Sequence, residues 1–217
     1  MVGEKKDEGV THGVFTVFDG TYVGEWRDGM PNGQGVLTTD EGDVYEGTFC
    51  HGNLTGFGKA TYAEGGKYEG EWQNGAMHSY GVCTYADGSR YEGEWKNGRI
   101  NGRGVLWSPG GDIREGYWQD GLMVGKGRRY YKNGDVYAGD FKRGLQTGHG
   151  TLTCKNGDVY NGEFRYAYFH GEGVYLYANG DRYEGAYENG KRHGRGSFTA
   201  ADGTVKKGIW QKDEYIG

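Results

Sequence analysis

A glycine recurs every 23 residues along nearly the whole chain, and this spacing constrains the fold more than any other feature of the sequence. An aromatic residue follows each of these repeated glycines two positions later. A period this regular is typical of a linear array in which one small unit packs on the next. The repeated glycines are Gly24, Gly47, Gly70, Gly93, Gly116, Gly139, Gly162, Gly185 and Gly208, and the aromatics are Trp26, Phe49, Trp72, Trp95, Trp118, Phe141, Phe164, Tyr187 and Trp210.

The repeated unit is clearest in the pentapeptide Tyr-Glu-Gly-Glu-Trp at 91–95. Alternate side chains of a strand point to opposite faces, so Tyr91, Gly93 and Trp95 share one face and the two glutamates share the other. Glycine is expected to open a notch on the aromatic face for a ring from an adjacent strand. A helix is excluded, because each glycine in a helix interior costs about 1 kcal/mol and glycines recur throughout.

A turn dipeptide ending in glycine precedes each pentapeptide, for example Asp87-Gly88. Asp-Gly and Asn-Gly steps supply the positive φ angles of tight primed turns, so each dipeptide is expected to close a β-hairpin. Glycine-rich segments such as 98–104 are expected to join successive hairpins. The predicted fold is all-β, an elongated, twisted, single-layer antiparallel sheet of about nine β-hairpins with no helix of note. Residues 1–12 are expected to form a mobile leader, and residues 13–217 one continuous array of nine 23-residue repeats.

Composition narrows the classes of function. With 46 glycines, 19 tyrosines and only 35% hydrophobic residues, the core is expected to be thin and aromatic. A net charge of −5 argues against nucleic-acid binding, which needs a basic surface. Cys50, Cys83 and Cys154 occupy different places in the repeat, so they are interpreted as free thiols of a reducing compartment. Neither a signal peptide nor a membrane-spanning apolar run is found, which favours a cytoplasmic location.

The combined pattern, Tyr-x-Gly-x-Trp/Phe-x-x-Gly-x-x-x-Gly-x-Gly followed by Asp/Asn-Gly, resembles the MORN-repeat family over residues 13–217. It resembles in particular the C-terminal arrays of MORN-only scaffold proteins of protist membrane skeletons. The resemblance implies homodimerisation, scaffolding near membranes and a disputed ability to bind phosphoinositides. Four departures from the pattern are expected to alter local geometry or to mark specialised surface: Arg114 and Lys206 replace the leading tyrosine, and Ser79 and Ala167 replace a joint glycine.

The repeated aromatic residues are interpreted as the structural core. Because a single open sheet has no second layer to cover it, part of this face is alternatively interpreted as a groove for a peptide, an acyl chain or a helix. The residues of this set are Tyr22, Trp26, Tyr45, Phe49, Tyr68, Trp72, Tyr91, Trp95, Trp118, Tyr137, Phe141, Tyr160, Phe164 and Tyr183.

Charged side chains recur in two ways. Acids such as Glu25, Asp140 and Glu163 share one position of the repeat and are interpreted as a solvent-facing ladder. Two stretches are rich in basic residues, which are either solvated strand faces or a site for anionic lipid headgroups. The headgroup candidates are Lys126, Arg128, Arg129 and Lys132 in the first stretch and Lys191, Arg192 and Arg195 in the second.

No catalytic or cofactor-binding residues are predicted, because the sequence contains no CxxC, HExxH or Walker motif and no serine that stands apart from the repeat. The chain is therefore interpreted as non-enzymatic and without a cofactor. His149 and Cys154 form the one close imidazole and thiol pair, and zinc bound by them at an oligomer interface is a weaker alternative.

The end of the chain predicts self-association. An exposed strand edge with apolar residues beside it favours a two-fold, tail-to-tail homodimer. The predicted function is a non-catalytic scaffold that homodimerises and tethers cytoskeletal proteins at a membrane-associated structure. A phosphoinositide-binding membrane module and a regulatory arm of a larger enzyme are the alternatives. The predicted dimer interface is Tyr187, Ile209, Trp210, Tyr215 and Ile216.

Overall fold

The computed structural model describes residues 9–217, which form 19 β-strands in an open antiparallel sheet and no helix. This confirms the all-β fold class. Contacts divide the chain into two compact units, Met1–Gly102 and Arg103–Gly217, and each is described by itself. Residues 1–8 of the predicted leader lie outside the described part, and the first strand begins at Thr11, inside the predicted leader.

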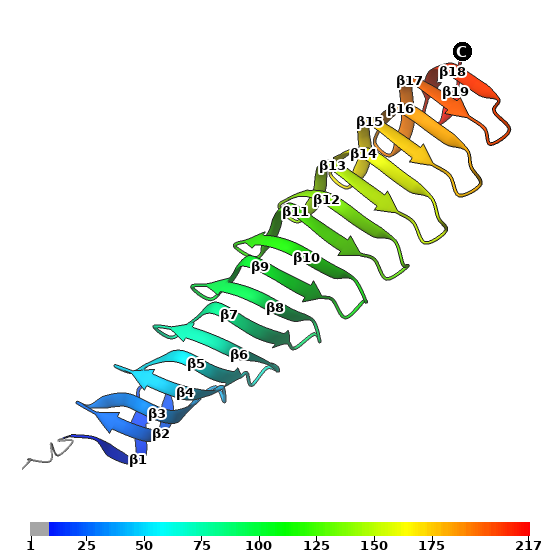
Figure 1. Cartoon of the computed structure of the whole chain (residues 1–217). Helices are drawn as coiled ribbons and strands as arrows, with labels where there is room; N and C mark the ends of the chain where they lie inside the picture. Colours follow the sequence, from blue (N-terminus) through cyan, green and yellow to red (C-terminus); the bar gives the residue numbers. More distant parts are fainter. Residues whose placement is uncertain (1–8) are drawn as a thin grey trace, which may run out of the picture. The chain divides into compact units, whose positions relative to one another are not determined.

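In the first unit every strand pairs with the strand before and after it in the chain, so the chain runs as a meander (Figure 1). The strands are β1 (Thr11–Val17), β2 (Gly20–Arg27), β3 (Met30–Thr39), β4 (Val44–Cys50), β5 (Asn53–Thr61), β6 (Gly66–Gln73), β7 (Ala76–Tyr85) and β8 (Arg90–Lys96), followed by β9 (Arg99–Trp107), which contains the boundary between the units.

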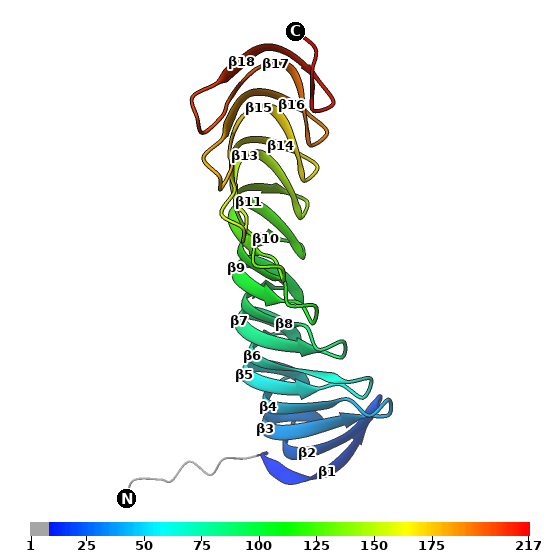
Figure 2. The same cartoon turned by 90° about the vertical axis from the view of Figure 1, so that its right-hand side faces the viewer.

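The second unit is a meander of the same kind. Figure 2 shows its last long strands as arcs. The structure has no helix within residues 9–217 that is long and apolar enough to span a membrane. The strands are β10 (Ile113–Gln119), β11 (Leu122–Tyr130), β12 (Val136–Lys142), β13 (Leu145–Thr153), β14 (Val159–Arg165), β15 (Tyr168–Leu176), β16 (Arg182–Glu188), β17 (Lys191–Thr199), β18 (Val205–Gln211) and β19 (Glu214–Tyr215).

The tight turns lie at the other end of the strands from the predicted ones. Asn74-Gly75 joins β6 to β7 with φ angles of 50° and 77°, and Asn189-Gly190 joins β16 to β17 with 51° and 83°. Two positive φ angles are the mark of a primed two-residue turn. The predicted turn Asp87-Gly88 has a positive φ only at Gly88 and lies in a longer loop, closed by a 2.8 Å bond from the Tyr85 amide to the Ser89 carbonyl. The sequence prediction was therefore wrong about the two kinds of connection: the segments predicted to be tight turns are longer loops, and the tight turns lie in the glycine-rich segments predicted to join successive hairpins.

Glycines pair with glycines across the sheet, strand after strand. In the first unit this glycine row is Gly13, Gly24, Gly35, Gly47, Gly58, Gly70, Gly81 and Gly93. In the second unit it is Gly116, Gly127, Gly139, Gly150, Gly162, Gly173, Gly185, Gly196 and Gly208.

In most repeats the ring of the leading tyrosine lies over the glycine row; over Gly47 and Gly58 the side chain of Leu54 takes this place instead. At Gly81 an added Cβ would lie 2.2 Å from the Tyr68 hydroxyl oxygen, and at Gly70 it would lie 2.7 Å from it. The Tyr68 hydroxyl donates a 3.0 Å hydrogen bond to the Glu71 carbonyl. The predicted notch is therefore real, but the ring that fills it comes from two residues earlier on the same strand.

The repeat at Arg114 lacks this tyrosine and is packed differently. Met123, which is fully buried, lies over the glycine row in its place. An added Cβ would lie 2.5 Å from the Met123 Cε at Gly116 and 2.1 Å from it at Gly127. The methionine fills the space that a tyrosine ring fills in most repeats, as Leu54 does over Gly47 and Gly58, so Arg114 is not needed to pack on the glycine row.

Two other departures leave the backbone geometry unchanged, contrary to expectation. Ser79 has φ 53° and its counterpart Gly56 has φ 66°, while Ala167 has φ 68° and its counterpart Gly144 has φ 78°. The Ala167 amide donates to the Gln146 carbonyl at 3.0 Å in this conformation. Such a conformation costs a residue with a side chain about 1 to 2 kcal/mol.

An aspartate in most repeats ties one long loop to the next. The Oδ1 atom of each accepts a hydrogen bond from the backbone amide 20 residues later. Sequence reasoning missed this role, although the aspartates recur at the repeat spacing. The bonds run from Ala63 to Asp43 (2.9 Å), Lys132 to Asp112 (3.1 Å), Lys155 to Asp135 (2.9 Å), Ala178 to Asp158 (2.8 Å) and Ala201 to Asp181 (2.8 Å).

Asp158 makes the stability of the fold depend on pH. The Ala178 amide, then Asn156 and Tyr175, hydrogen-bond its carboxylate and lower its pKa. A lowered folded-state pKa means that the stabilisation is present at neutral pH and is lost as pH falls through that pKa. We expect Asp158→Asn to lower the free energy of unfolding in urea at pH 7. The difference from the wild type should shrink below about pH 4, where the wild-type carboxyl is increasingly protonated; a constant difference would contradict this account.

Candidate binding site

The sheet presents two faces of opposite character. The inner face is the one that carries the leading tyrosines, and the outer face carries the residues that alternate with them. Twelve of the predicted aromatic residues are buried, with exposures of 0 to 6%, whereas Trp26 and Tyr45 are half-buried. Their rings pack edge to face, for example Tyr68 with Trp95 at 5.4 Å between centroids. The buried rings form the core, which favours the core interpretation over that of an open groove lined by them.

A β-bulge follows the glycine row in every second strand. Gly139 pairs with Gly150, but the next residue, Asp140, pairs with Thr147, which leaves Gly148 and His149 as extra residues. Gly148 adopts φ 57°, the left-handed conformation that such a bulge needs. The residue after it, here His149, is called the bulge residue, and it lies on the outer face. The other bulge residues with a resolved register shift are Gln34, Phe57, Tyr80, Lys126, Glu172 and Arg195.

The repeated acids hold these bulges. Asp140 Oδ2 accepts a 3.1 Å hydrogen bond from the His149 amide, and Glu163 Oε1 accepts one of 3.2 Å from the Glu172 amide. Glu25 Oε1 does the same for the Gln34 amide at 3.1 Å. The interpretation of these three acids as a purely solvent-facing ladder is therefore wrong, because each one satisfies a backbone donor.

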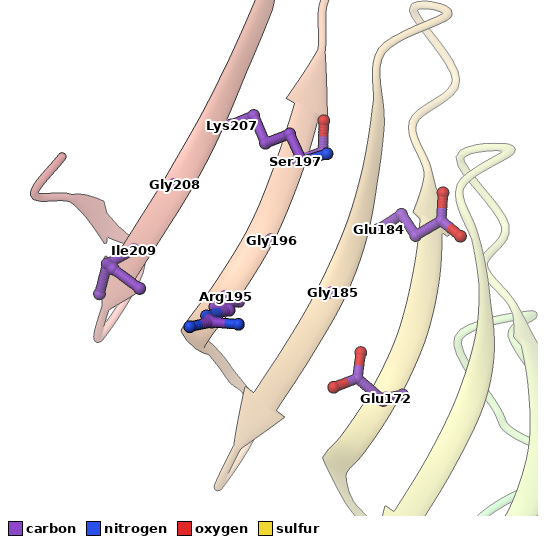
Figure 3. Close-up of a pocket in the computed structure, with 9 residues that line it drawn as sticks. All are labelled: Glu172, Glu184, Gly185, Arg195, Gly196, Ser197, Lys207, Gly208 and Ile209. Atoms are coloured by element: carbon purple, nitrogen blue, oxygen red, sulfur yellow. The ribbon is translucent and has the colours of Figure 1, made fainter.

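Ala186, like Thr48 and Tyr117, departs from this rule, and a hollow lies nearby on the outer face of β15 to β18. Ala186 occupies the position of Asp140 and Glu163 but has no carboxylate to offer the Arg195 amide. Figure 3 shows the hollow, with Glu172 and Glu184 on one side and Arg195 and Lys207 on the other. Glu184 is also paired with Arg182 at 2.6 Å. The lining is Glu172, Glu184, Gly185, Arg195, Gly196, Ser197, Lys207, Gly208 and Ile209.

The first predicted basic cluster is divided between the faces. Lys126 and Arg128 lie on the outer face, where Lys126 pairs with Asp140 at 2.8 Å. Arg129 lies on the inner face, where it pairs with Asp112 and its guanidinium lies 4.3 Å from the Tyr131 ring centroid. Lys132 is exposed in the following loop. These four side chains do not converge on one point, which favours the interpretation as strand-face residues over that of a single headgroup site.

The second basic cluster is divided in the same way. Arg192 lies on the inner face, with its guanidinium 4.4 Å from the Trp210 ring centroid and its Nη2 donating to the Asp213 carbonyl at 2.9 Å. Arg195 lines the hollow on the outer face, and Lys191 is exposed at the start of β17. Arg192 thus binds the end of the chain to the sheet. It does not share one site with Lys191 and Arg195, as a single headgroup site would require.

The predicted dimer residues fall into two groups. Tyr187 and Trp210 are only 6% and 4% exposed, because they pack in the core of their own chain. These two side chains are therefore not available for a dimer interface. Ile209, Tyr215 and Ile216 are 39%, 42% and 58% exposed. The tail folds back on β18, since the Ile209 amide donates to the Gly217 carbonyl at 2.6 Å and the Ile216 amide to the Ile209 carbonyl at 2.9 Å.

The predicted zinc pair does not form part of a ligand cluster. His149 is an exposed bulge residue on β13, and Cys154 is half-buried in the following loop. Burial, then Asp135 and Asp158, raises the pKa of the Cys154 thiol, which disfavours the thiolate that zinc requires. Among residues 9–217 no group of three or more histidine, cysteine or acidic side chains is placed to hold a metal ion.

Comparison with family models gives a match to the model described as MORN repeat. It matches eight segments, residues 22–44, 45–67, 68–90, 91–113, 115–136, 137–159, 160–182 and 183–205. The ninth glycine position, Gly208, lies beyond the last matched segment. A search of curated proteins gave no match.

Several solved structures are similar in their strand arrangement. The TCP domain of Drosophila melanogaster SAS-4 (dCPAP), in complex with a proline-rich motif of Ana2 (dSTIL), is 10% identical with a TM-score of 0.46, covering 86% of this chain and 97% of that one. The TCP10 domain of Danio rerio CPAP, in complex with a STIL peptide, is 14% identical with a TM-score of 0.49, covering 82% and 80%. These values are too low to carry an argument about the function of this chain.

Proposed function

Because the chain belongs to the MORN-repeat family, we propose that it is a non-catalytic scaffold that homodimerises through its C-terminal hairpins. In this proposal the dimer tethers cytoskeletal partners at a membrane-associated structure. The cytoskeletal part rests on the resemblance of the repeat pattern to scaffold proteins of membrane skeletons. The dimer part rests on the surface of the last four long strands.

The proposal of a dimer rests on the arrangement of acidic and basic side chains around the hollow. Two acids, Glu172 and Glu184, come from β15 and β16, and two bases, Arg195 and Lys207, come from β17 and β18. A two-fold axis brings the same patch of two copies together. An axis through the hollow would place the acids of each copy against the bases of the other. The exposed side chain of Ile209 lies beside the bases and supplies apolar area.

A charge-reversal pair tests this arrangement. Light scattering after size exclusion is expected to give a dimer for the wild type and a monomer for Glu172→Lys and for Arg195→Glu, because each change places like charges opposite one another. Mixing the two variants should restore a dimer. Lys142→Glu, an exposed reversal on β12 outside the hollow, is the control and should remain dimeric. A wild-type monomer at all concentrations, or variants that stay dimeric, would sink the proposal.

Direct phosphoinositide binding receives less support. Of the seven predicted headgroup residues, Lys126, Arg129 and Arg192 are already engaged with acidic residues or the tail carbonyl. The remaining four come from β11, from the loop after it and from β17. A headgroup site needs several cations that converge on one anion. Cosedimentation with phosphoinositide vesicles at physiological salt that falls in a Lys126→Gln, Arg128→Gln variant would favour the lipid function instead.

A further inference from the structure

Two arginines face each other across the inner face of β10 and β11. Arg114 and Arg129 are direct cross-strand partners in the antiparallel register. Like charges directly opposite one another destabilise a sheet. In six of the other eight repeats the position of Arg114 carries a buried tyrosine, and Tyr137 and Tyr160 are both 0% exposed; Tyr45 is half-buried and Lys206 is exposed. The chain therefore holds a second cation where the repeat normally places an uncharged ring.

One of the two arginines has an internal partner. The Arg129 Nε donates to Asp112 Oδ2 at 3.1 Å, and its Nη2 bonds the same oxygen. The other oxygen of Asp112 accepts the Lys132 amide at 3.1 Å. Both carboxylate oxygens are thus occupied, and the charge of Asp112 offsets that of Arg129. The pKa of Asp112 is lowered, chiefly by the bond from Arg129, so the carboxyl is ionised at neutral pH.

Arg114 has no hydrogen bond or ion pair of its own within the described part of the chain. Its Nε is buried and unbonded, while the residue as a whole is half-buried. Burial, followed by the neighbouring Arg129, lowers the pKa of its guanidinium, as expected for a charge that is partly desolvated beside a like charge. Removing one partner from a buried charge is strongly unfavourable in most proteins.

The surroundings favour an oxyanion as the missing partner. The Tyr131 ring, which lies under Arg129, is held by a 2.5 Å hydrogen bond from Gln146 Nε2, and Gln146 is only 4% exposed. This holds the ring against which the Arg129 guanidinium packs, and a guanidinium binds carboxylate and phosphate through a planar pair of donors. With Asp112 counted, the cluster has a net charge of +1, which matches a carboxylate better than a phosphate group of charge about −1.5 to −2.

We propose that Arg114, supported by Arg129 and Tyr131, binds a side-chain carboxylate of an acidic peptide segment on the inner face of β10 and β11. At this position of the repeat the chain has an arginine in place of the tyrosine ring. Met123 makes the exchange possible, because it fills the space over the glycine row that the ring would occupy. The site is independent of the hollow at β15 to β18, so it does not depend on the proposed dimer.

Binding of an end-blocked tetraglutamate peptide to the full chain tests the proposal, measured by calorimetry and by NMR of the arginine Nε signals at low ionic strength. We expect Arg114→Gln to weaken binding at least tenfold. Arg128→Gln, on the neighbouring strand β11 and on the outer face, is the matched control and should change binding less than twofold. Equal loss in the two variants, or no binding to the wild type at millimolar peptide, would overturn the proposal.

A second measurement separates binding from folding. Without peptide, Arg114→Gln should have a urea midpoint equal to or higher than that of the wild type, because it removes a charge without a partner. A large fall in the midpoint would show an internal role for Arg114 and would also overturn the proposal. Arg114-dependent binding to phosphoinositide vesicles without binding to the peptide would reassign the site to a lipid headgroup.

Discussion

Gly150→Ala is expected to lower the free energy of unfolding by about 3 kcal/mol, the upper range for forcing extra volume into a packed site. The new methyl group would lie 2.5 Å from both Cε2 and the hydroxyl oxygen of Tyr137. Tyr137 is fully buried and its hydroxyl is bonded to the Asp140 carbonyl at 3.0 Å, so the ring cannot move aside without losing that bond. Chemical denaturation followed by tryptophan fluorescence measures the change.

Gly110→Ala is the matched control for this prediction. Gly110 lies in a loop of the same unit, has no positive φ, and an added Cβ there meets nothing within 4 Å. Its replacement should change the free energy of unfolding by less than about 0.5 kcal/mol, as for an ordinary surface site. If the two variants are equally stable, the leading tyrosine does not pack on the glycine row in the way described.

Trp95→Ala is expected to cost about 3 to 5 kcal/mol, because it removes a large ring from the core and leaves a cavity. Trp95 is 4% exposed and packs edge to face on Tyr68 and Tyr91 at 5.4 and 5.3 Å. Its Nε1 also donates to the Gly81 carbonyl at 3.2 Å. Thermal and urea unfolding both report the loss.

Phe57→Ala is the comparison for the tryptophan variant. Phe57 is a bulge residue on the outer face and is 58% exposed, so its removal should leave stability nearly unchanged. A small effect of Trp95→Ala together with loss of a bound partner would instead support the groove interpretation of the aromatic face. Similar losses in both variants would mean that the outer face is covered in solution.

The period of the repeat predicted the strands and their two faces, because spacing and alternation are properties of the chain alone. It did not predict which turns are tight. An Asp-Gly step such as Asp87-Gly88 is compatible with two loop lengths, and the choice depends on backbone hydrogen bonds such as that from Tyr85 to Ser89. Alternation alone would have placed Lys126 and Arg129 on opposite faces of the sheet, but the sequence did not reveal their acidic partners, Asp140 and Asp112.

The candidate sites were visible in sequence only as departures from the pattern. Arg114 was marked by the missing tyrosine, but its cross-strand partner Arg129 follows from the register and not from the repeat. The hollow was not predicted, because its charged lining comes from four different strands, β15 to β18, and is brought together only by their register. The role of Asp140 and Glu163 in accepting a hydrogen bond from a bulge amide was likewise not visible in the sequence.

The meander has a consequence for how each unit folds. Every strand pairs with its immediate neighbours in the chain, and the loop bridges join residues only 20 positions apart. Chains with contacts of such short range have a low contact order and fold quickly for their size. A nascent repeat can therefore pack as soon as the next one leaves the ribosome, without waiting for distant sequence, which is unusual for a protein made only of β-strands.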